Sequence, residues 1–132
     1  MQQTQKMRQR LLKAVFTVII LLGAWGASTQ YNKEYFHYMG RQAMMNNDYQ
    51  QAIKTLNVLL RFDEDDYEGY FLRGIAKYNL DDLLGADSDF SSALEKNPVY
   101  TIAYTYRAIT RSRLGNYDDA LKDFHEAIDL RP

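Results

Sequence analysis

From residue 33 onward, apolar and polar residues follow one another with a helical period, and clusters of turn-forming residues interrupt the pattern. Short interruptions fall at Asn46-Asn47-Asp48, Asp81-Asp82 and Gly115-Asn116, where the residue types suit turns and helix N-caps. Longer interruptions fall at residues 63–66 and at Asn97-Pro98. The pattern therefore predicts six helices, over residues 33–46, 49–62, 67–80, 83–96, 101–114 and 117–130.

The six predicted helices read as three copies of one pair, because small residues recur at a fixed step. Ala52, Ala86 and Ala120 are equally spaced, and large or small residues upstream and downstream keep the same register. The positions in register are Gly40, Ala52, Leu56, Gly74, Ala86, Phe90, Ala93, Ala108, Ala120, Phe124 and Ala127. Regular repetition of this kind indicates a repeat architecture, so the fold class is predicted as all-α.

The small residues have a physical role in such pairs. Two antiparallel helices approach closely only where one of them offers Gly or Ala, so Gly40, Ala52 and their equivalents mark the crossing of each pair. Large residues then fill the space on either side of the crossing: Phe36, Leu56, Tyr70, Phe90, Tyr104 and Phe124. We expect three stacked helical hairpins.

The copies read F-x2-M-G-x2-A then A-x3-L, Y-x2-R-G-x2-K then A-x3-F…P, and Y-x2-R-A-x2-R then A-x3-F…P. This resembles the tetratricopeptide repeat, a 34-residue helix–turn–helix with the pattern W-x2-L-G-x2-Y…A-x3-F…P. The departures are the missing tryptophan, Arg73 and Arg107 in place of leucine, and Glu64 in place of the boundary proline that Pro98 and Pro132 supply. The resemblance implies an α-solenoid with repeats at 33–66, 67–100 and 101–132.

The resemblance also implies a concave groove, lined by the first helix of each pair, that binds a peptide or a partner helix. The residues that it places there are Tyr38, Arg41, Phe71, Leu72, Ile75, Tyr78, Tyr106, Ile109 and Arg113, with Glu34, His37, Met45, Asn79, Ile102 and Thr105 beside them. Phe71, Ile75 and Tyr78 lie at i, i+4 and i+7, so we expect one apolar stripe with Arg41 or Arg113 as charged anchors. Alternatively, further repeats or a C-terminal helix fill this groove.

Family members that clamp the acidic C-terminal tails of cytosolic heat-shock chaperones carry Lys, Asn and Arg at fixed groove positions. This sequence has His37, Arg41, Leu72, Ile102 and Tyr106 there. The resemblance therefore does not extend to that carboxylate clamp.

The N-terminal segment 1–28 differs from the rest of the chain in charge. It contains no acid and four cations, Lys6, Arg8, Arg10 and Lys13, followed by an uncharged stretch from Ala14 to Ala27. A signal-peptide core needs about 7–15 apolar residues and a membrane-spanning helix about 20. Residues 1–28 are therefore predicted to be a signal peptide, with an uncleaved signal anchor and an amphipathic or buried helix as alternatives. Either of the first two makes the body extracytoplasmic, in a bacterial periplasm or cell envelope.

Composition narrows the chemistry. Residues 29–132 hold 12 basic and 17 acidic residues, which argues against nucleic-acid binding. There is no cysteine, and the acids at 63–66 lack the spacing of a calcium loop. His37 and His125 have no third ligand at a metal-site spacing, so we expect both histidines to have a surface or groove role. We therefore expect no metal or cofactor. No catalytic motif occurs, so an enzyme is not expected.

Three functions fit this sequence. The leading one is a non-catalytic scaffold for a protein or peptide partner, exported or anchored by the first helix. The second is an accessory region of a larger enzyme or sensor, and the third is a membrane-anchored import or assembly receptor. Leu121, Phe124, Ala127 and Ile128 give the last helix an apolar face with nothing after it. We therefore expect either further repeats beyond residue 132 or a partner docked there.

Overall fold

The computed structural model describes residues 7, 10, 13–15, 17–18 and 32–131 of the chain. The chain divides into two units, Met1–Glu34 and Tyr35–Pro132, which are described separately. In the first unit Met7, Val15 and Val18 are helical and exposed. The predicted signal peptide or anchor at residues 1–28 lies mostly outside the described residues. In the part of the chain that the structure covers, no helix has the length and apolar character needed to cross a membrane.

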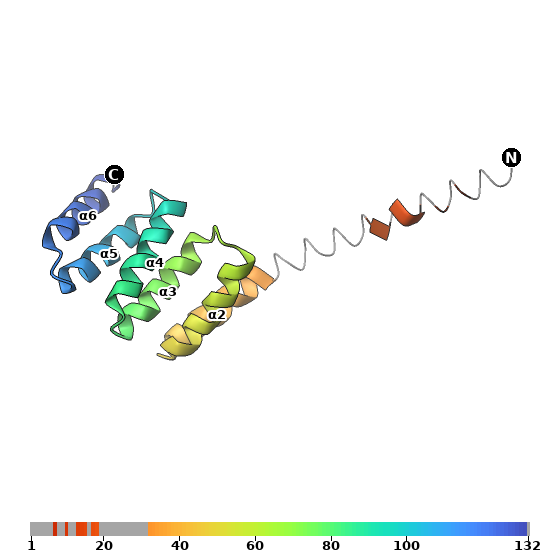
Figure 1. Ribbon diagram of the computed structural model, residues 1–132, viewed down its shortest axis with the longest axis horizontal. Helices are drawn as coiled ribbons and strands as arrows, with labels where there is room; N and C mark the ends of the chain where they lie inside the picture. Colours follow the sequence, from red (N-terminus) through yellow and green to blue (C-terminus); the bar gives the residue numbers. More distant parts are fainter. Residues whose placement is uncertain (1–6, 8–9, 11–12, 16, 19–31, 132) are drawn as a thin grey trace. The chain divides into compact units, whose positions relative to one another are not determined.

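The second unit is a stack of helix pairs (Figure 1), and the prediction of an all-α fold of this kind is confirmed. Residues 32–45 are helical, and five helices follow: α2 (Tyr49–Phe62), α3 (Tyr67–Asn79), α4 (Leu83–Lys96), α5 (Thr101–Arg113) and α6 (Tyr117–Asp129). The predicted helix ends differ from the observed ones by at most one residue.

The turns within the pairs share one backbone conformation. Asn47, Asp81 and Gly115 occupy the same position in successive repeats and have φ angles of 58°, 65° and 82°. Asn, Asp and Gly tolerate this left-handed region best, because their side chains are short and polar or absent. Each of these residues ends the first helix of its pair and turns the chain into the second.

Three aspartates begin the helices that follow. The side chains of Asp48, Asp66 and Asp82 accept hydrogen bonds from the backbone N–H of the third residue on, and so act as N-caps of α2, α3 and α4. The N-cap residue of α5 is Tyr100, whose side chain makes no such bond.

The stack has an inner and an outer layer. Each helix packs against the next one along the chain, and α3 also contacts α5. Among the helices α2 to α6, the second members of the pairs, α2, α4 and α6, do not contact one another. The first members therefore lie closer together than the second, which makes their side the inner one.

Glycines allow the close approach within the pairs. A Cβ atom on Gly74 would lie 2.7 Å from Cε1 of Phe90, and one on Gly40 would lie 3.0 Å from Cδ2 of Leu56. Phe90 and Leu56 are fully buried, as are the alanines Ala52, Ala86, Ala93 and Ala108. Ala120 and Ala127 are also buried, Phe124 is half-buried and Pro98 is exposed.

Candidate partner-binding face

Three repeat-equivalent sets of residues form a stripe on the inner helices. Each set takes one residue from the helix at 35–45, one from α3 and one from α5, and the sets lie at i, i+3 and i+7, which is one face of a helix. The sets are Tyr38, Leu72 and Tyr106; Arg41, Ile75 and Ile109; and Met45, Asn79 and Arg113. We call these nine residues the inner stripe.

The inner stripe offers apolar surface to solvent. Tyr38 is 58% exposed and Ile109 37% exposed, while Leu72, Ile75 and Tyr106 are half-buried. Ile102, beside the stripe on α5, is 45% exposed. The exposed apolar surface therefore runs across all three helices.

Phe71, which the sequence placed in the groove, lies in the core. It is 5% exposed, and its ring meets those of Tyr100 and Tyr106 edge to face, with centroids 5.1 and 5.4 Å away, and that of Phe90 at 5.8 Å. The physical reason is that Tyr100, the N-cap residue of α5, covers the ring. Phe71 contributes packing between repeats rather than an exposed contact.

Tyr100 belongs to the same aromatic group, and its ring also meets that of Tyr67 at 4.9 Å. Burial raises the pKa of Tyr100 to about 12, and the nearby Glu68 carboxylate and Tyr67 contribute to the same rise. A phenol in this position therefore stays neutral across the physiological range and acts as a packing group.

His37 is also buried, so the expected surface or groove role is wrong. Only 4% of the residue is exposed, and its Nε2 lies 2.8 Å from Oδ2 of Asp66, which is buried too. The other carboxylate oxygen of Asp66 accepts a 2.6 Å hydrogen bond from the N–H of Gly69. Nδ1 of His37 has no hydrogen-bond partner in the described structure.

The two contacts involve equivalent positions of successive repeats. Phe71 is the repeat equivalent of His37, and Tyr100 is that of Asp66. The first junction between repeats is thus joined by a polar pair and the second by an aromatic pair. His125, on α6, is exposed.

The two arginines expected as anchors are paired within the chain. Arg41 forms an ion pair with Glu68 of α3. Nη2 of Arg113 lies 2.6 Å from Oδ1 of Asp81, and its guanidinium lies over the ring of Tyr78, 4.9 Å from the centroid. Tyr78 and Asp81 both raise the pKa of Arg113.

The arginines that replace the usual leucine have buried aspartate partners, which the sequence did not lead us to expect. Arg73 binds both carboxylate oxygens of Asp89 at 2.7 and 2.8 Å, and Arg107 binds those of Asp123 at 2.7 and 2.9 Å. Both aspartates are 3% exposed. The signal was present in the sequence, because the same Arg and Asp positions recur together in the second and third repeats.

A second cation joins each of these pairs. Lys77 lies 2.9 Å from Asp89, and its equivalent Arg111 lies 3.0 Å from Asp123 and 2.7 Å from Asp87. The contacts to Asp89 and Asp123 hold α3 to α4 and α5 to α6, and the Arg111–Asp87 pair joins α5 to α4.

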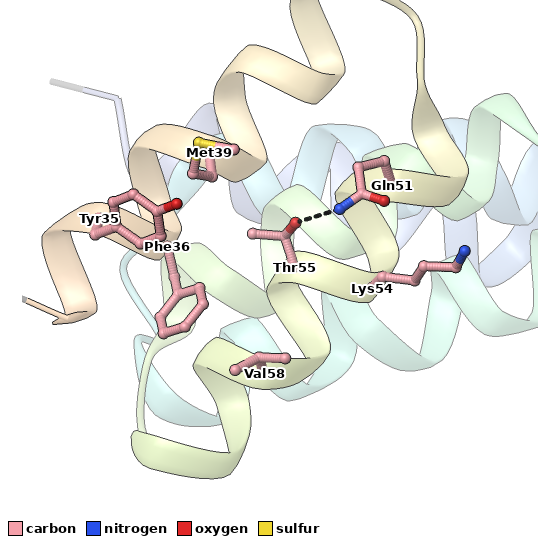
Figure 2. A pocket seen from close by; sticks show the side chains of 7 residues that line it. All are labelled: Tyr35, Phe36, Met39, Gln51, Lys54, Thr55 and Val58. Carbon is pink, nitrogen blue, oxygen red and sulfur yellow. Dashed lines mark hydrogen bonds between the residues drawn. The ribbon is translucent and has the colours of Figure 1, made fainter.

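The first repeat lacks this network and has a small cavity instead (Figure 2). Met39 and Thr55 occupy the positions of Arg73 and Asp89, and they line a cavity of about 260 Å³. Its walls are Tyr35, Phe36, Met39, Gln51, Lys54, Thr55 and Val58. At its edge Gln51 donates a 3.4 Å hydrogen bond to the Thr55 hydroxyl, which is the dashed line in Figure 2. Nothing in the sequence had pointed to this cavity.

The described side chains contain no group of three or more His, Cys, Asp or Glu residues placed to hold a metal ion. The acids at 63–66 serve other contacts: Asp66 caps α3, and Asp65 accepts a 2.8 Å bond from Lys96.

Comparison with known proteins places the fold. Residues 102–132 match the family model of the tetratricopeptide repeat. No curated protein matches the sequence. Among solved structures, the TPR2B domain of yeast Sti1 in complex with pHsp70 is 24% identical, with a TM-score of 0.74 over 76% of this chain and 80% of that one.

Two further structures show the same likeness. The first TPR of Spaghetti (RPAP3), bound to the HSP90 peptide SRMEEVD, is 24% identical, with a TM-score of 0.75 over 77% of this chain and 81% of that one. MamA is 25% identical, with a TM-score of 0.74 over 76% of this chain and 59% of that one. Residues 102–132 therefore match one tetratricopeptide repeat, and the unit from Tyr35 onward shares the fold of stacked tetratricopeptide repeats.

Proposed function

We propose that the chain is a non-catalytic scaffold that binds a segment of a partner protein on the inner stripe. The observation that carries this proposal is the exposure of repeat-equivalent apolar residues on three adjacent helices, with Tyr38 at 58% and Ile109 at 37%. Apolar patches that extend over several elements of a folded domain mark interaction sites. Two of the structurally similar domains have a chaperone or chaperone peptide bound, which supports the same use of the fold here.

A selection of random displayed peptides against the full chain tests this proposal. The best peptide is then measured by fluorescence anisotropy against the chain, Ile109→Asp and the matched control Leu84→Asp, whose side chain is 75% exposed on α4. We expect Ile109→Asp to weaken binding at least about tenfold, since a charge replaces an apolar contact, and Leu84→Asp to leave it unchanged. Equal affinities for the three proteins would remove the inner stripe as the site.

We also propose that residues 1–28 export or anchor this scaffold, which places the repeats outside the cytoplasm. The support is the basic head followed by the uncharged stretch Ala14–Ala27. The N-terminal sequence of the protein recovered from cell-envelope fractions tests this: a start near residue 28 indicates cleavage, and an intact N-terminus in the membrane fraction indicates an anchor. Recovery of the intact chain from the cytosol alone would contradict both.

A further inference from the structure

We infer that the partner segment is recognised by uncharged, apolar side chains inside its sequence, and not by a terminal carboxylate or a run of charged residues. This inference rests on the proposed function and specifies the chemistry of the partner. It follows from the state of the charged groups around the inner stripe.

The inner helices offer a partner no unpaired cation. From Tyr35 to Arg113, the described Lys and Arg side chains of the helix at 35–45, α3 and α5 all have acidic partners. The cations are Arg41, Arg73, Lys77, Arg107, Arg111 and Arg113. An acidic partner would have to displace one of these carboxylates.

Such a displacement brings little gain. Arg41 and Glu68 are 48% and 39% exposed, and Arg113 and Asp81 are 43% and 76% exposed. Replacing one exposed carboxylate by another leaves the number of ion pairs unchanged, and exposed pairs are weak. Arg113 would also lose its position over Tyr78.

A basic partner meets the same obstacle. From Tyr35 onward, the acids beside the inner stripe are Glu68 and Asp81, and they are already held by Arg41 and Arg113. The charges around the stripe therefore cancel locally, and charge complementarity favours neither sign of partner.

What remains available is apolar surface. Tyr38, Ile109 and Ile102 are exposed, and Leu72 and Ile75 lie half-buried between them on α3. Burying large apolar side chains here releases water without breaking any of the ion pairs. A neutral segment with several Leu, Ile, Phe or Tyr residues matches this surface.

Three pools of synthetic peptides of equal length test the inference, with Ser and Gly as spacers between Leu/Ile/Phe, Asp/Glu or Lys/Arg residues. Each pool carries acetylated and amidated ends, and the peptide SRMEEVD is added with a free and with an amidated C-terminus. Binding to the full chain, Ile109→Asp and Leu84→Asp is measured by anisotropy at about 50 and 500 mM NaCl, a range over which exposed charges become screened.

We expect the apolar pool to bind at least about tenfold more tightly than the others, with less than about a twofold change between the two salt concentrations. Tightest binding by the acidic pool or free-acid SRMEEVD, weakened by amidation or salt, overturns the inference while leaving the proposed function intact. Tightest binding by the basic pool does the same. If no pool distinguishes the chain from Ile109→Asp, the proposed function fails with it.

Discussion

Gly74 shows how a single hydrogen atom sets the spacing of a helix pair. The ring of Phe90 occupies the place where any larger side chain would begin, and this ring is fully buried. At Gly40 the equivalent neighbour is the end of the Leu56 side chain, which is more flexible than a ring and can shift by a small rotation.

We predict that Gly74→Ala destabilises the fold by about 1–2 kcal/mol, because overpacking a rigid ring outweighs the better helix propensity of alanine. Gly40→Ala is the matched variant, and we expect its change to stay within about 0.5 kcal/mol, since the two effects there nearly cancel. Urea unfolding followed by circular dichroism measures both. Equal losses would show that the ring of Phe90 is not the limiting contact.

The buried aspartates act at the same scale. Asp89 is held by Arg73 and Lys77, whereas the first repeat has Met39, Ala43 and Thr55 in these three places and folds into the same pair of helices. Removing one member of a buried ion pair lowers the stability strongly, because the other charge stays buried without it. Replacing all members together by uncharged side chains often changes the stability little.

We therefore predict that Arg73→Met alone costs about 2 kcal/mol, because Asp89 stays buried with Lys77 as its remaining partner. The triple variant Arg73→Met, Lys77→Ala, Asp89→Thr copies the first repeat, and we expect it to recover at least about half of that loss. Thermal or urea unfolding measures the free energy of unfolding of the original chain, the single variant and the triple variant. A triple variant less stable than Arg73→Met would mean that the charged group is a net stabiliser of the second repeat, and that the side chains of the first repeat do not replace it.

At the scale of the helix, junction chemistry differs between repeats. Asp66 caps α3 and binds His37 beneath it, so one carboxylate serves the start of a helix and the contact between two repeats. Asp82 caps α4 in the same way but is exposed, and the cap bond is the one hydrogen bond of its side chain in the described structure.

We predict that Asp82→Ala costs about 1 kcal/mol, the usual value of an N-cap. Asp66→Ala should cost about 1–2 kcal/mol more, because it also leaves the buried His37 without its carboxylate. Adding His37→Phe, which copies Phe71 at the equivalent position of the second repeat, should recover this additional loss of stability. Losses of the same size for Asp66→Ala and Asp82→Ala would argue against a stabilising His37–Asp66 contact.

The helices themselves could be predicted closely, because turn residues recur once or twice in every repeat and leave little freedom in where each helix ends. The facing of individual side chains could not. Phe71 and Leu72 are neighbours on α3 and equally apolar, and the rings of Phe90, Tyr100 and Tyr106, which lie outside α3, decide that Phe71 is covered. Likewise, an aspartate on an amphipathic helix is normally solvated, so the burial of Asp89 follows from Arg73 and not from the helical pattern.

At the scale of the whole repeat unit, burial changes along the stack. Leu60 and Leu94, at equivalent positions of the first two repeats, are 9% and 6% exposed under the repeat that follows. Ile128 is the third equivalent and is 66% exposed, and Leu121 on the same helix is 58% exposed. The free energy of unfolding of each repeat therefore depends on the neighbouring repeat that covers it.

We predict that Leu94→Ala costs about 2–5 kcal/mol, as expected for a buried leucine. In the same chain, Ile128→Ala should change the stability by less than about 0.5 kcal/mol, because its side chain is already in water. Amide hydrogen exchange should agree, with α6 exchanging faster than α3 and α4. A large loss for Ile128→Ala would mean that this side chain is covered in solution, by a second copy or by another segment.

The difference between the two junctions has a consequence for how such a gene can change. Recombination between near-identical repeats exchanges, deletes or duplicates them freely as long as every copy fits every neighbour. Here each contact joins the two ends of one copy, His37 with Asp66 in 33–66 and Phe71 with Tyr100 in 67–100, so a whole copy carries its contact with it. A crossover inside a copy would instead set His37 against Tyr100, or Phe71 against Asp66, and would place a buried polar group opposite a ring. Selection should therefore favour exchanges that break the gene between repeats over exchanges that break it inside one.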